Sequence, residues 1–269
     1  MQMKGDPMAQ QPIRFEDGAA YERMMGAWSR PAGDVFLDWL APRKGLKRID
    51  VGCGNGAFTE LIVAKTAPVE VWGIDPSDGQ LAYARSRRGV EMAEFRKGDA
   101  MALPFPDHCF DVAIMALVIF FVPEPAKGVA EMVRVVAPGG TVAAYAWDFA
   151  GGGFPLEPIQ VELRTAGFSP PRPPTWEVSK MDALRNVWTE AGLVDVATRR
   201  IDVQRSFVDF DDFWAAAKLG PSVAPLFASM AAEDTARIKT RLRAHVKEDD
   251  AGRISYGSFA NAITGRVPG

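Results

Sequence analysis

The chain has 269 residues, of which 48% are apolar and 24% are charged. This composition is ordinary for a soluble globular protein that can bury a large core. The net charge of −3 gives no electrostatic reason to expect nucleic acid or an anionic membrane surface as a partner. The longest uncharged apolar run, residues 112–122, has eleven residues, which is too short to cross a bilayer.

The start of the chain and its two cysteines bear on where the protein is found. Residues 1–14 contain no apolar signal core, and we expect them to form a disordered tail. Cys53 and Cys109 lie far apart and lack the spacing of a metal site, so we expect neither a disulfide nor a bound metal. Together these features point to the cytoplasm.

Two helices are expected before the first strand. Residues 15–29 carry an apolar stripe that includes Tyr21, Met25 and Trp28. A second helix is predicted to begin at Pro31, because proline is favoured at the first helical position. The stripe on the first helix either packs into the core or covers a binding site as a lid.

From residue 48 to residue 147, predicted strands alternate with predicted helices. The strands end near residues 51, 74, 96, 115 and 147, and helices are expected to begin near residue 58 and to run at about 79–88 and 126–136. This alternation predicts a parallel α/β sheet with right-handed connections.

The last part of the chain has a different character. Residues 148–175 are rich in glycine and proline and should form an excursion with one short helix near 158–166. A helix is predicted at 180–191 and a long strand at 194–207, where apolar and polar residues alternate. Two further helices, 209–218 and 225–248, precede a last strand at 258–264.

A glycine-rich turn follows the first strand. Residues 48–58 read R-I-D-V-G-C-G-N-G-A-F, with Gly52, Gly54 and Gly56 between a short apolar strand and the start of a helix. Glycine is required where the backbone takes a positive φ or where a ligand approaches the main chain closely. The pattern therefore predicts a cofactor cradle at the carboxyl edge of the sheet. The nicotinamide fingerprint G-x-G-x-x-G would need its third glycine at Ala57, where alanine is also accepted, so the turn alone leaves the cofactor class open.

Acidic residues follow the next two strands. Asp75 lies nineteen residues beyond Gly56, at the tip of the second strand, where it can accept hydrogen bonds from both ribose hydroxyls. Its alternative role is a helix N-cap. Asp99 ends the third strand and can accept from an adenine amino group, although such a residue is also common in turns. Together the two residues predict an adenosine site.

At this point the chain resembles the class I S-adenosylmethionine-dependent methyltransferases, in particular the branch that methylates quinones and other small molecules. The resemblance runs from about residue 21 to residue 147 and rests on these segments in order: Y-E-R-M-M-G-A-W-S-R, D-V-G-C-G-N-G, G-I-D-P-S, G-D-A-M-A-L-P-F-P, F-D-V-A-I and R-V-V-A-P-G-G. It implies a seven-stranded Rossmann-like sheet with helices on both faces, whose last strand runs antiparallel between the fifth and the sixth.

The resemblance also implies how the chain is divided and where the cofactor is bound. Residues 15–269 would form one domain, with lid helices at 15–47, a cofactor-binding core at 48–147, substrate-side insertions at 148–257 and the last strand at 258–269. The residues expected around S-adenosylmethionine are Tyr21, Met25, Trp28, Ser29, Gly52, Cys53, Gly54, Asp75, Pro76, Ser77, Gln80, Asp99, Ala100, Met101, Ala116 and Leu117.

The expected activity is methyl transfer to a small, apolar or aromatic acceptor by in-line displacement. Alignment of the reactants can contribute roughly 7–11 kcal/mol, so a phenolate, thiolate or enolate needs no base. Many relatives carry a histidine after the fourth strand where this chain has Phe120 and Phe121, which leaves Asp148 as a weak candidate base. An apolar substrate pocket is expected from these side chains, unless they pack in the core: Phe120, Phe121, Trp147, Phe149 and Trp214.

Two other functions stay open from the sequence. One is a catalytically silent module that binds S-adenosylmethionine, since no base is obvious. The other is an NAD(P)-dependent oxidoreductase on a related sheet. In each case we expect a small-molecule ligand, no nucleic-acid partner, and a monomer or a homodimer.

Overall fold

The structure is a computed structural model that describes residues 25–220 and 222–269. The predicted tail at 1–14, Tyr21 and most of the first predicted helix therefore lie outside the described residues.

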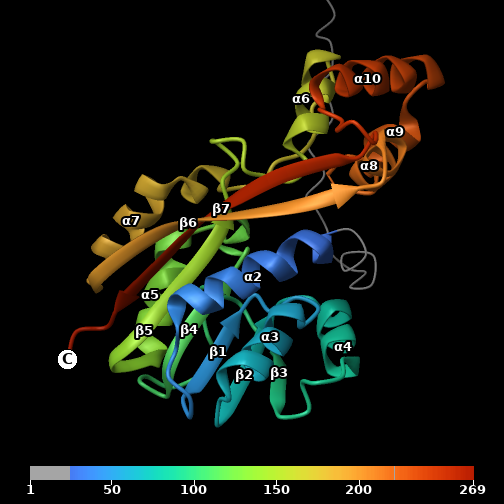
Figure 1. The fold of residues 1–269 in the computed structure, drawn as a ribbon. Coiled ribbons are helices and arrows are strands. Elements are labelled where there is room, and N and C mark those ends of the chain that lie inside the picture. Colours follow the sequence, from blue (N-terminus) through green and yellow to red (C-terminus); the bar gives the residue numbers. More distant parts are fainter. Residues whose placement is uncertain (1–24, 221) are drawn as a thin grey trace, which may run out of the picture.

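A seven-stranded sheet forms the centre of the molecule, with strand order β3-β2-β1-β4-β5-β7-β6 (Figure 1). Five strands pair in parallel, and their bounds are β1 Lys47–Val51, β2 Glu70–Asp75, β3 Ala93–Lys97, β4 Phe110–Ala116 and β5 Val136–Trp147. The last strand, β7 (Ile254–Arg266), pairs antiparallel with both β5 and β6 (Val194–Phe207). The predicted fold, including the antiparallel strand between the fifth and the sixth, is confirmed.

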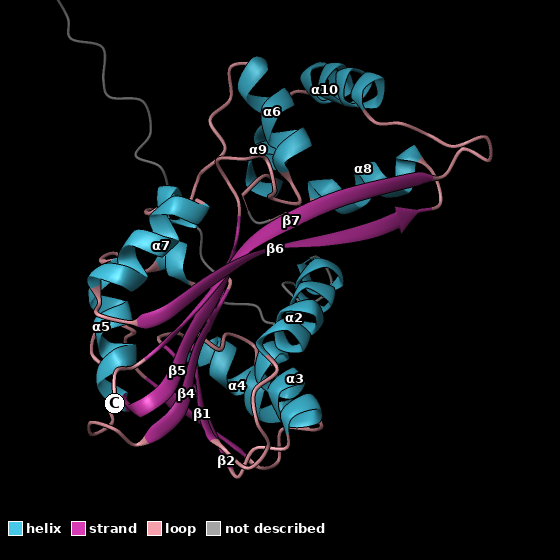
Figure 2. Cartoon of the chain, turned by 60° about the vertical axis from the view of Figure 1, so that its left-hand side comes forward, coloured by secondary structure: helices cyan, strands magenta, loops and turns pink. Residues whose placement is uncertain are grey.

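Helices cover both faces of this sheet (Figure 2). On one face lie α2 (Ala27–Leu40), α3 (Ala57–Thr66) and α4 (Asp78–Ser86). On the other lie α5 (Pro125–Val135) and α7 (Met181–Glu190). Because both faces are covered, the central strands are buried along most of their length, as their continuous apolar sequences require.

One predicted boundary near the first strand is wrong. Pro31 does not begin a second helix but lies inside α2, which runs without a break from Ala27 to Leu40. In an α-helix, the residue at position 31 would donate its N–H to the carbonyl of Ala27. Proline therefore removes one hydrogen bond of α2 near its start, and the helix continues on both sides of it.

The far halves of β6 and β7 extend beyond the rest of the sheet. β5 pairs only with residues 260–266 of β7, whereas β6 pairs along nearly the whole of β7. The unsupported halves form a two-stranded ribbon that carries α8 (Phe210–Lys218), α9 (Ala224–Ser229) and α10 (Ala232–His245), with α6 (Glu157–Thr165) packed against α10 (Figures 1 and 2). We call the ribbon and these four helices the arm.

The predicted helix at 225–248 is two helices in the structure. The chain is extended at Met230 and Ala231, between α9 and α10. The Ser229 hydroxyl donates to the carbonyls of Pro225 and Leu226, and so closes the last turn of α9. Neither glycine nor proline marks this break, so the sequence gives little sign of it.

Candidate active site

A cavity of about 360 Å³ opens at the carboxyl ends of β1, β2 and β4, on the side covered by the first turn of α2. Its size falls in the range of small-molecule sites, and its position at the ends of parallel strands is where α/β sheets bind ligands. The described residues that line it are Gly26, Ser29, Arg30, Asp50, Gly52, Cys53, Gly54, Asn55, Ala57, Phe58, Leu61, Ile74, Asp75, Pro76, Ser77, Gln80, Gly98, Asp99, Ala100, Ala116, Leu117, Val118, Phe121, Val122, Pro123 and Tyr145.

The glycine turn forms one wall of the cavity. Gly52, Gly54 and Gly56 have φ values of 79°, 52° and 78°, a region that other residues rarely adopt. A Cβ at Gly52 would lie 2.4 Å from a methyl carbon of Val118, whereas one at Gly54 would meet nothing nearer than Oε1 of Gln80 at 4.0 Å. Gly52 is therefore required for packing, and Gly54 leaves bare backbone facing open space where a ligand could approach.

Asp75 is positioned by two backbone donors at the end of β2. One carboxylate oxygen accepts from the Gly54 N–H at 2.9 Å, and the other accepts from the Ser77 N–H at 2.9 Å. Burial raises the pKa of Asp75, and the two backbone hydrogen bonds oppose that rise. Each carboxylate oxygen has a second lone pair, so Asp75 can still accept hydrogen bonds from a ligand. Ser77 also caps α4 by accepting from the Gln80 N–H, so part of the expected N-cap role falls to the serine.

Asp99 reaches the same cavity from the end of β3. Its carboxylate accepts from the Met101 N–H at 2.9 Å, which fixes the turn that follows the strand. Asp75, Asp99 and the glycine turn thus converge on one hollow, as an adenosine site requires. Their contacts with ribose and adenine stay predictions.

Asp50, the acidic residue before the glycines, is the most unusual group in the cavity wall. It is fully buried, and its Oδ2 accepts from the Thr59 hydroxyl at 2.7 Å. Its Oδ1 is buried too and has no hydrogen-bond partner among the described residues. Burial raises the pKa of Asp50 to about 7; the Thr59 hydrogen bond opposes this rise, and the charge on Asp75 adds to it.

Asp50 is absent from the residues expected to contact the cofactor. Its place two residues before the first glycine was visible in the sequence, but its burial was not. A buried carboxylate oxygen without a partner, in the wall of a cavity, is suited to receive a donor or a cation from a ligand.

The start of α2 covers one side of the cavity. Gly26, Ser29 and Arg30 line it, and the buried Ser29 hydroxyl has no hydrogen-bond partner among the described residues. Met25 and Trp28 do not line it. The Trp28 ring packs edge-on against Tyr256 of β7, with centroids 5.9 Å apart, so it anchors the lid to the arm.

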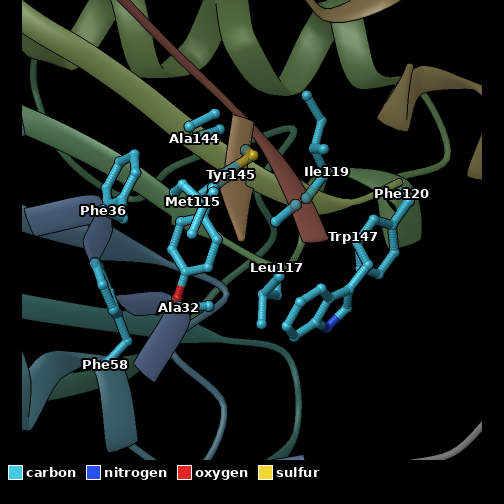
Figure 3. Packing of buried hydrophobic residues seen from close by; sticks show 14 of the residues in the cluster. Ala32, Phe36, Phe58, Met115, Leu117, Ile119, Phe120, Ala144, Tyr145 and Trp147 are labelled. Carbon is cyan, nitrogen blue, oxygen red and sulfur yellow. The ribbon is translucent and has the colours of Figure 1, made fainter. Parts of the chain in front are cut away.

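The end of β4 supplies an apolar wall made of Ala116, Leu117 and Val118. Leu117 has a positive φ of 61°, and its N–H donates to the Tyr145 carbonyl at 2.8 Å, which ties the turn to β5. The Tyr145 ring is buried between β5 and α2, with its hydroxyl directed toward α2 (Figure 3). The expected residues Ala116 and Leu117 thus lie at the cavity together with Tyr145, which no motif in the sequence singles out.

Only one of the five aromatic residues expected in a substrate pocket lines the cavity, and that residue is Phe121. Phe120 packs edge-on against Phe149, with ring centroids 5.0 Å apart, and Trp147 is buried in the core cluster (Figure 3). Trp214 packs against another aromatic ring within the arm. These four rings contact other side chains, which is the alternative that the sequence left open.

The remaining expected residues also lie away from the cavity. Met101 does not line it, although its neighbours Asp99 and Ala100 do. Asp148 lies outside it, and its carboxylate accepts from the Gly151 N–H at 2.6 Å and from the Asn261 side chain at 3.0 Å. Both oxygens of Asp148 thus stabilise the turn after β5.

The side chains in the cavity wall suit a polar cofactor. No group of three or more histidine, cysteine, aspartate or glutamate residues that could hold a metal occurs within the described residues. The lining combines three carboxylates, one guanidinium and bare glycine backbone, a set that fits a nucleoside joined to an amino acid.

No helix in the described part of the chain is long and apolar enough to span a membrane.

The chain is similar to known methyltransferases in sequence. Residues 49–144 match the profile of a methyltransferase domain family. The ubiquinone/menaquinone biosynthesis C-methyltransferase UbiE of Dinoroseobacter shibae is 35% identical over 121 residues, which is 44% of this chain and 48% of that protein. The demethylmenaquinone methyltransferase of Bacillus cytotoxicus is 38% identical over 104 residues, covering 37% and 44%. The chain therefore spans about half the length of the curated relatives that it matches.

Solved structures share the fold over most of the chain. The YcgJ protein from Bacillus subtilis has a TM-score of 0.60 at 18% identity, covering 88% of this chain and 98% of its own. A Haemonchus contortus phosphoethanolamine N-methyltransferase 2, solved with S-adenosyl-L-methionine, has a TM-score of 0.58 at 16% identity, covering 94% and 57%. Residues 49–144 thus match a methyltransferase domain family, and the seven-stranded sheet that contains them has the fold of solved methyltransferases.

Proposed function

We propose that the chain is an S-adenosylmethionine-dependent methyltransferase acting on a small, apolar or aromatic acceptor. The observation that carries this proposal is the convergence of Asp50, Asp75, Asp99 and the glycine turn on one cavity. A nicotinamide dinucleotide would instead place a pyrophosphate at the start of α3, where phosphate oxygens need free N–H donors. Here the Ala57 N–H donates to the Asn55 side chain, and three of the four charged wall residues are acidic.

In the proposed complex, each carboxylate takes a different part of the cofactor. Asp75 accepts from the ribose hydroxyls, and Asp99 accepts from the adenine amino group. Gly52 and Gly54 present backbone to the amino-acid end, and Asp50 receives the ammonium. When bound, S-adenosylmethionine supplies an electrophilic methyl group on a sulfonium.

The chain's own contribution to methyl transfer is alignment and exclusion of water. Ala116, Leu117, Val118 and Phe121 form an apolar wall beside the expected transfer position. Holding two reactants in line can supply roughly 7–11 kcal/mol of the barrier reduction. The described lining contains no histidine and no lysine, and Asp148 lies outside it. The site is therefore suited to acceptors that react as anions already, such as phenolates, thiolates or enolates.

The names of the curated relatives support the same class of acceptor, because they describe methyl transfer in ubiquinone and menaquinone biosynthesis. We propose a quinol or related phenol as the substrate class. The two cysteines, both free in the structure, further favour a cytoplasmic protein. We expect it to be a monomer or a homodimer, which light scattering after size-exclusion chromatography distinguishes.

Calorimetric titration tests the cofactor assignment. The wild-type chain should bind S-adenosylmethionine and S-adenosylhomocysteine but not NADH or NADPH. Asp75→Ala should weaken binding at least tenfold, because charge-assisted hydrogen bonds to ribose are worth about 1.5–3 kcal/mol. Asp78→Ala is the matched control, since its carboxylate is exposed on α4 and pairs with Lys97. Tighter binding of a nicotinamide cofactor would contradict the proposal.

Transfer of an isotopically labelled methyl group tests the activity itself. Incubation with a panel of phenols, hydroquinones and thiols should yield a product that is heavier by the labelled methyl group, read by mass spectrometry. Cofactor binding without transfer to any member of the panel would favour the catalytically silent module, which the absence of a histidine or lysine from the described cavity wall also fits.

A further inference from the structure

The wall of the cavity has a marked imbalance of charge. Three of the described lining residues are acidic, and Arg30, in the first turn of α2, is the one basic residue among them. The amino-acid end of S-adenosylmethionine carries one ammonium and one carboxylate. With Asp50 suited to the ammonium, the carboxylate needs a cation. We propose that Arg30 binds this α-carboxylate and so couples α2 to the cofactor.

The surroundings of Arg30 leave a positive charge for a ligand. Both terminal guanidinium nitrogens of Arg30 lie 3.3 Å from Oε1 of Glu60, whereas Arg87 donates to Oε2 of the same carboxylate at 2.8 Å. One carboxylate thus serves two guanidinium groups and pairs more closely with Arg87. A guanidinium has five N–H donors in a planar fork, so Arg30 keeps donors that can meet a carboxylate side-on.

The fold holds Arg30 at this place from both sides. Trp28, two residues earlier, is buried against Tyr256 and Phe207 of the arm, with ring centroids 5.9 and 6.5 Å apart. Pro31, the next residue, has a fixed backbone φ and lies together with Arg30 inside the continuous helix α2. The first turn of α2 is therefore ordered against the arm, and the guanidinium needs only side-chain rotation to reach a ligand.

A purely structural role for Arg30 makes a different prediction. Its side chain is 49% exposed, and an exposed ion pair such as Arg30–Glu60 adds little to stability. If this pair were the whole function of Arg30, its loss would leave ligand recognition unchanged. The two roles are therefore separated by whether Arg30 distinguishes ligands with and without a carboxylate.

The inference about Arg30 rests on the proposed function. A pair of ligands tests the role of Arg30 and the proposed function separately. S-adenosylhomocysteine and its decarboxylated analogue, 5′-S-(3-aminopropyl)-5′-thioadenosine, differ only in the carboxylate. By calorimetry, the wild-type chain should prefer S-adenosylhomocysteine by about ten- to a hundredfold. Arg30→Gln should remove most of this preference and leave the affinity for the analogue within about twofold. Arg30→Lys should restore only part of it, since lysine lacks the planar fork.

Arg88→Gln is the matched control, because it removes the same charge from an exposed residue that does not line the cavity. It should keep the full preference, and all variants should keep the wild-type melting temperature. Equal wild-type affinity for the two ligands, or an unchanged preference in Arg30→Gln, would overturn the role of Arg30 while leaving the proposed function intact. Failure of the wild-type chain to bind either ligand would overturn both.

Discussion

Replacing Asp50 with asparagine should stabilise the unliganded protein at neutral and alkaline pH while weakening its hold on the cofactor. Burial raises the pKa of Asp50 from 3.8 to about 7. Between these values the folded protein keeps a proton that the unfolded chain has released. The free energy of unfolding therefore falls as pH rises from about 4 to about 7, by roughly 4 kcal/mol at 1.36 kcal/mol for each pKa unit.

Asparagine has nearly the shape of aspartate, and its amide oxygen can still accept from the Thr59 hydroxyl. It carries no charge to desolvate, so at pH 8 the variant should gain a few kcal/mol, and near pH 4 almost nothing. Urea denaturation followed by tryptophan fluorescence measures both values. Asp38→Asn is the matched control, since its carboxylate is 70% exposed and its removal should change stability by less than about 1 kcal/mol at either pH.

The affinity for the cofactor should rise with pH, whereas the free energy of unfolding falls. An ammonium placed at Asp50 favours the ionised carboxylate, so wild-type affinity for S-adenosylhomocysteine should rise as pH passes through 7, and Asp50→Asn should bind more weakly at pH 8. The other titratable groups near Asp50 are Asp75 and the buried Cys53 thiol, whose pKa is also raised by burial. A flat pH profile of wild-type stability, or no gain for the variant at pH 8, would refute this account of the buried carboxylate.

Three further results are expected. Gly52→Ala should destabilise the fold by about 2–4 kcal/mol, because its Cβ would lie 2.4 Å from Val118 at a φ of 79°; an unchanged urea midpoint would show that the turn differs from the one described. Trp28→Ala should cost about 3–5 kcal/mol by emptying a buried site against Tyr256, and a smaller loss in thermal unfolding would mean that the lid is not anchored to the arm. Burial raises the pKa of the Cys53 thiol, so iodoacetamide should label this thiol at least tenfold more slowly than it labels free glutathione at pH 8. Equal labelling rates, measured by peptide mass spectrometry, would rule out a buried thiol.

Helices and strands could be predicted where the local pattern of apolar and polar residues agrees with which face of the element is buried. β6 runs from Val194 to Phe207, the same residues that the alternating pattern marks, because one face of this strand is buried along the ribbon. Two predicted helix boundaries are wrong because no local signal in the sequence marks them. Pro31 suggests the start of a helix, because proline is favoured there, but in the structure it lies inside one. The break after α9 involves neither glycine nor proline.

Candidate site residues could be predicted where they stand at strand ends. Asp75 and Asp99 had to meet at one edge once their strands were parallel, and both line the cavity. The aromatic residues could not be assigned in this way. Phe120 and Phe121 are adjacent and chemically identical, yet only Phe121 lines the cavity. An apolar side chain has the same pattern in a sequence whether it fills the core or faces a ligand.

The amino-acid sequence by itself determined the order of strands and helices, the glycine turn and the acidic strand tips, because each depends on local conformation or on the side-chain period of a single element. Only the tertiary structure decided the charge state of Asp50, the approach of Arg30 to the cavity and the enclosure of Trp147 in the core. These properties depend on how much water is excluded around a group and on which distant side chains surround it, and neither is encoded in neighbouring residues.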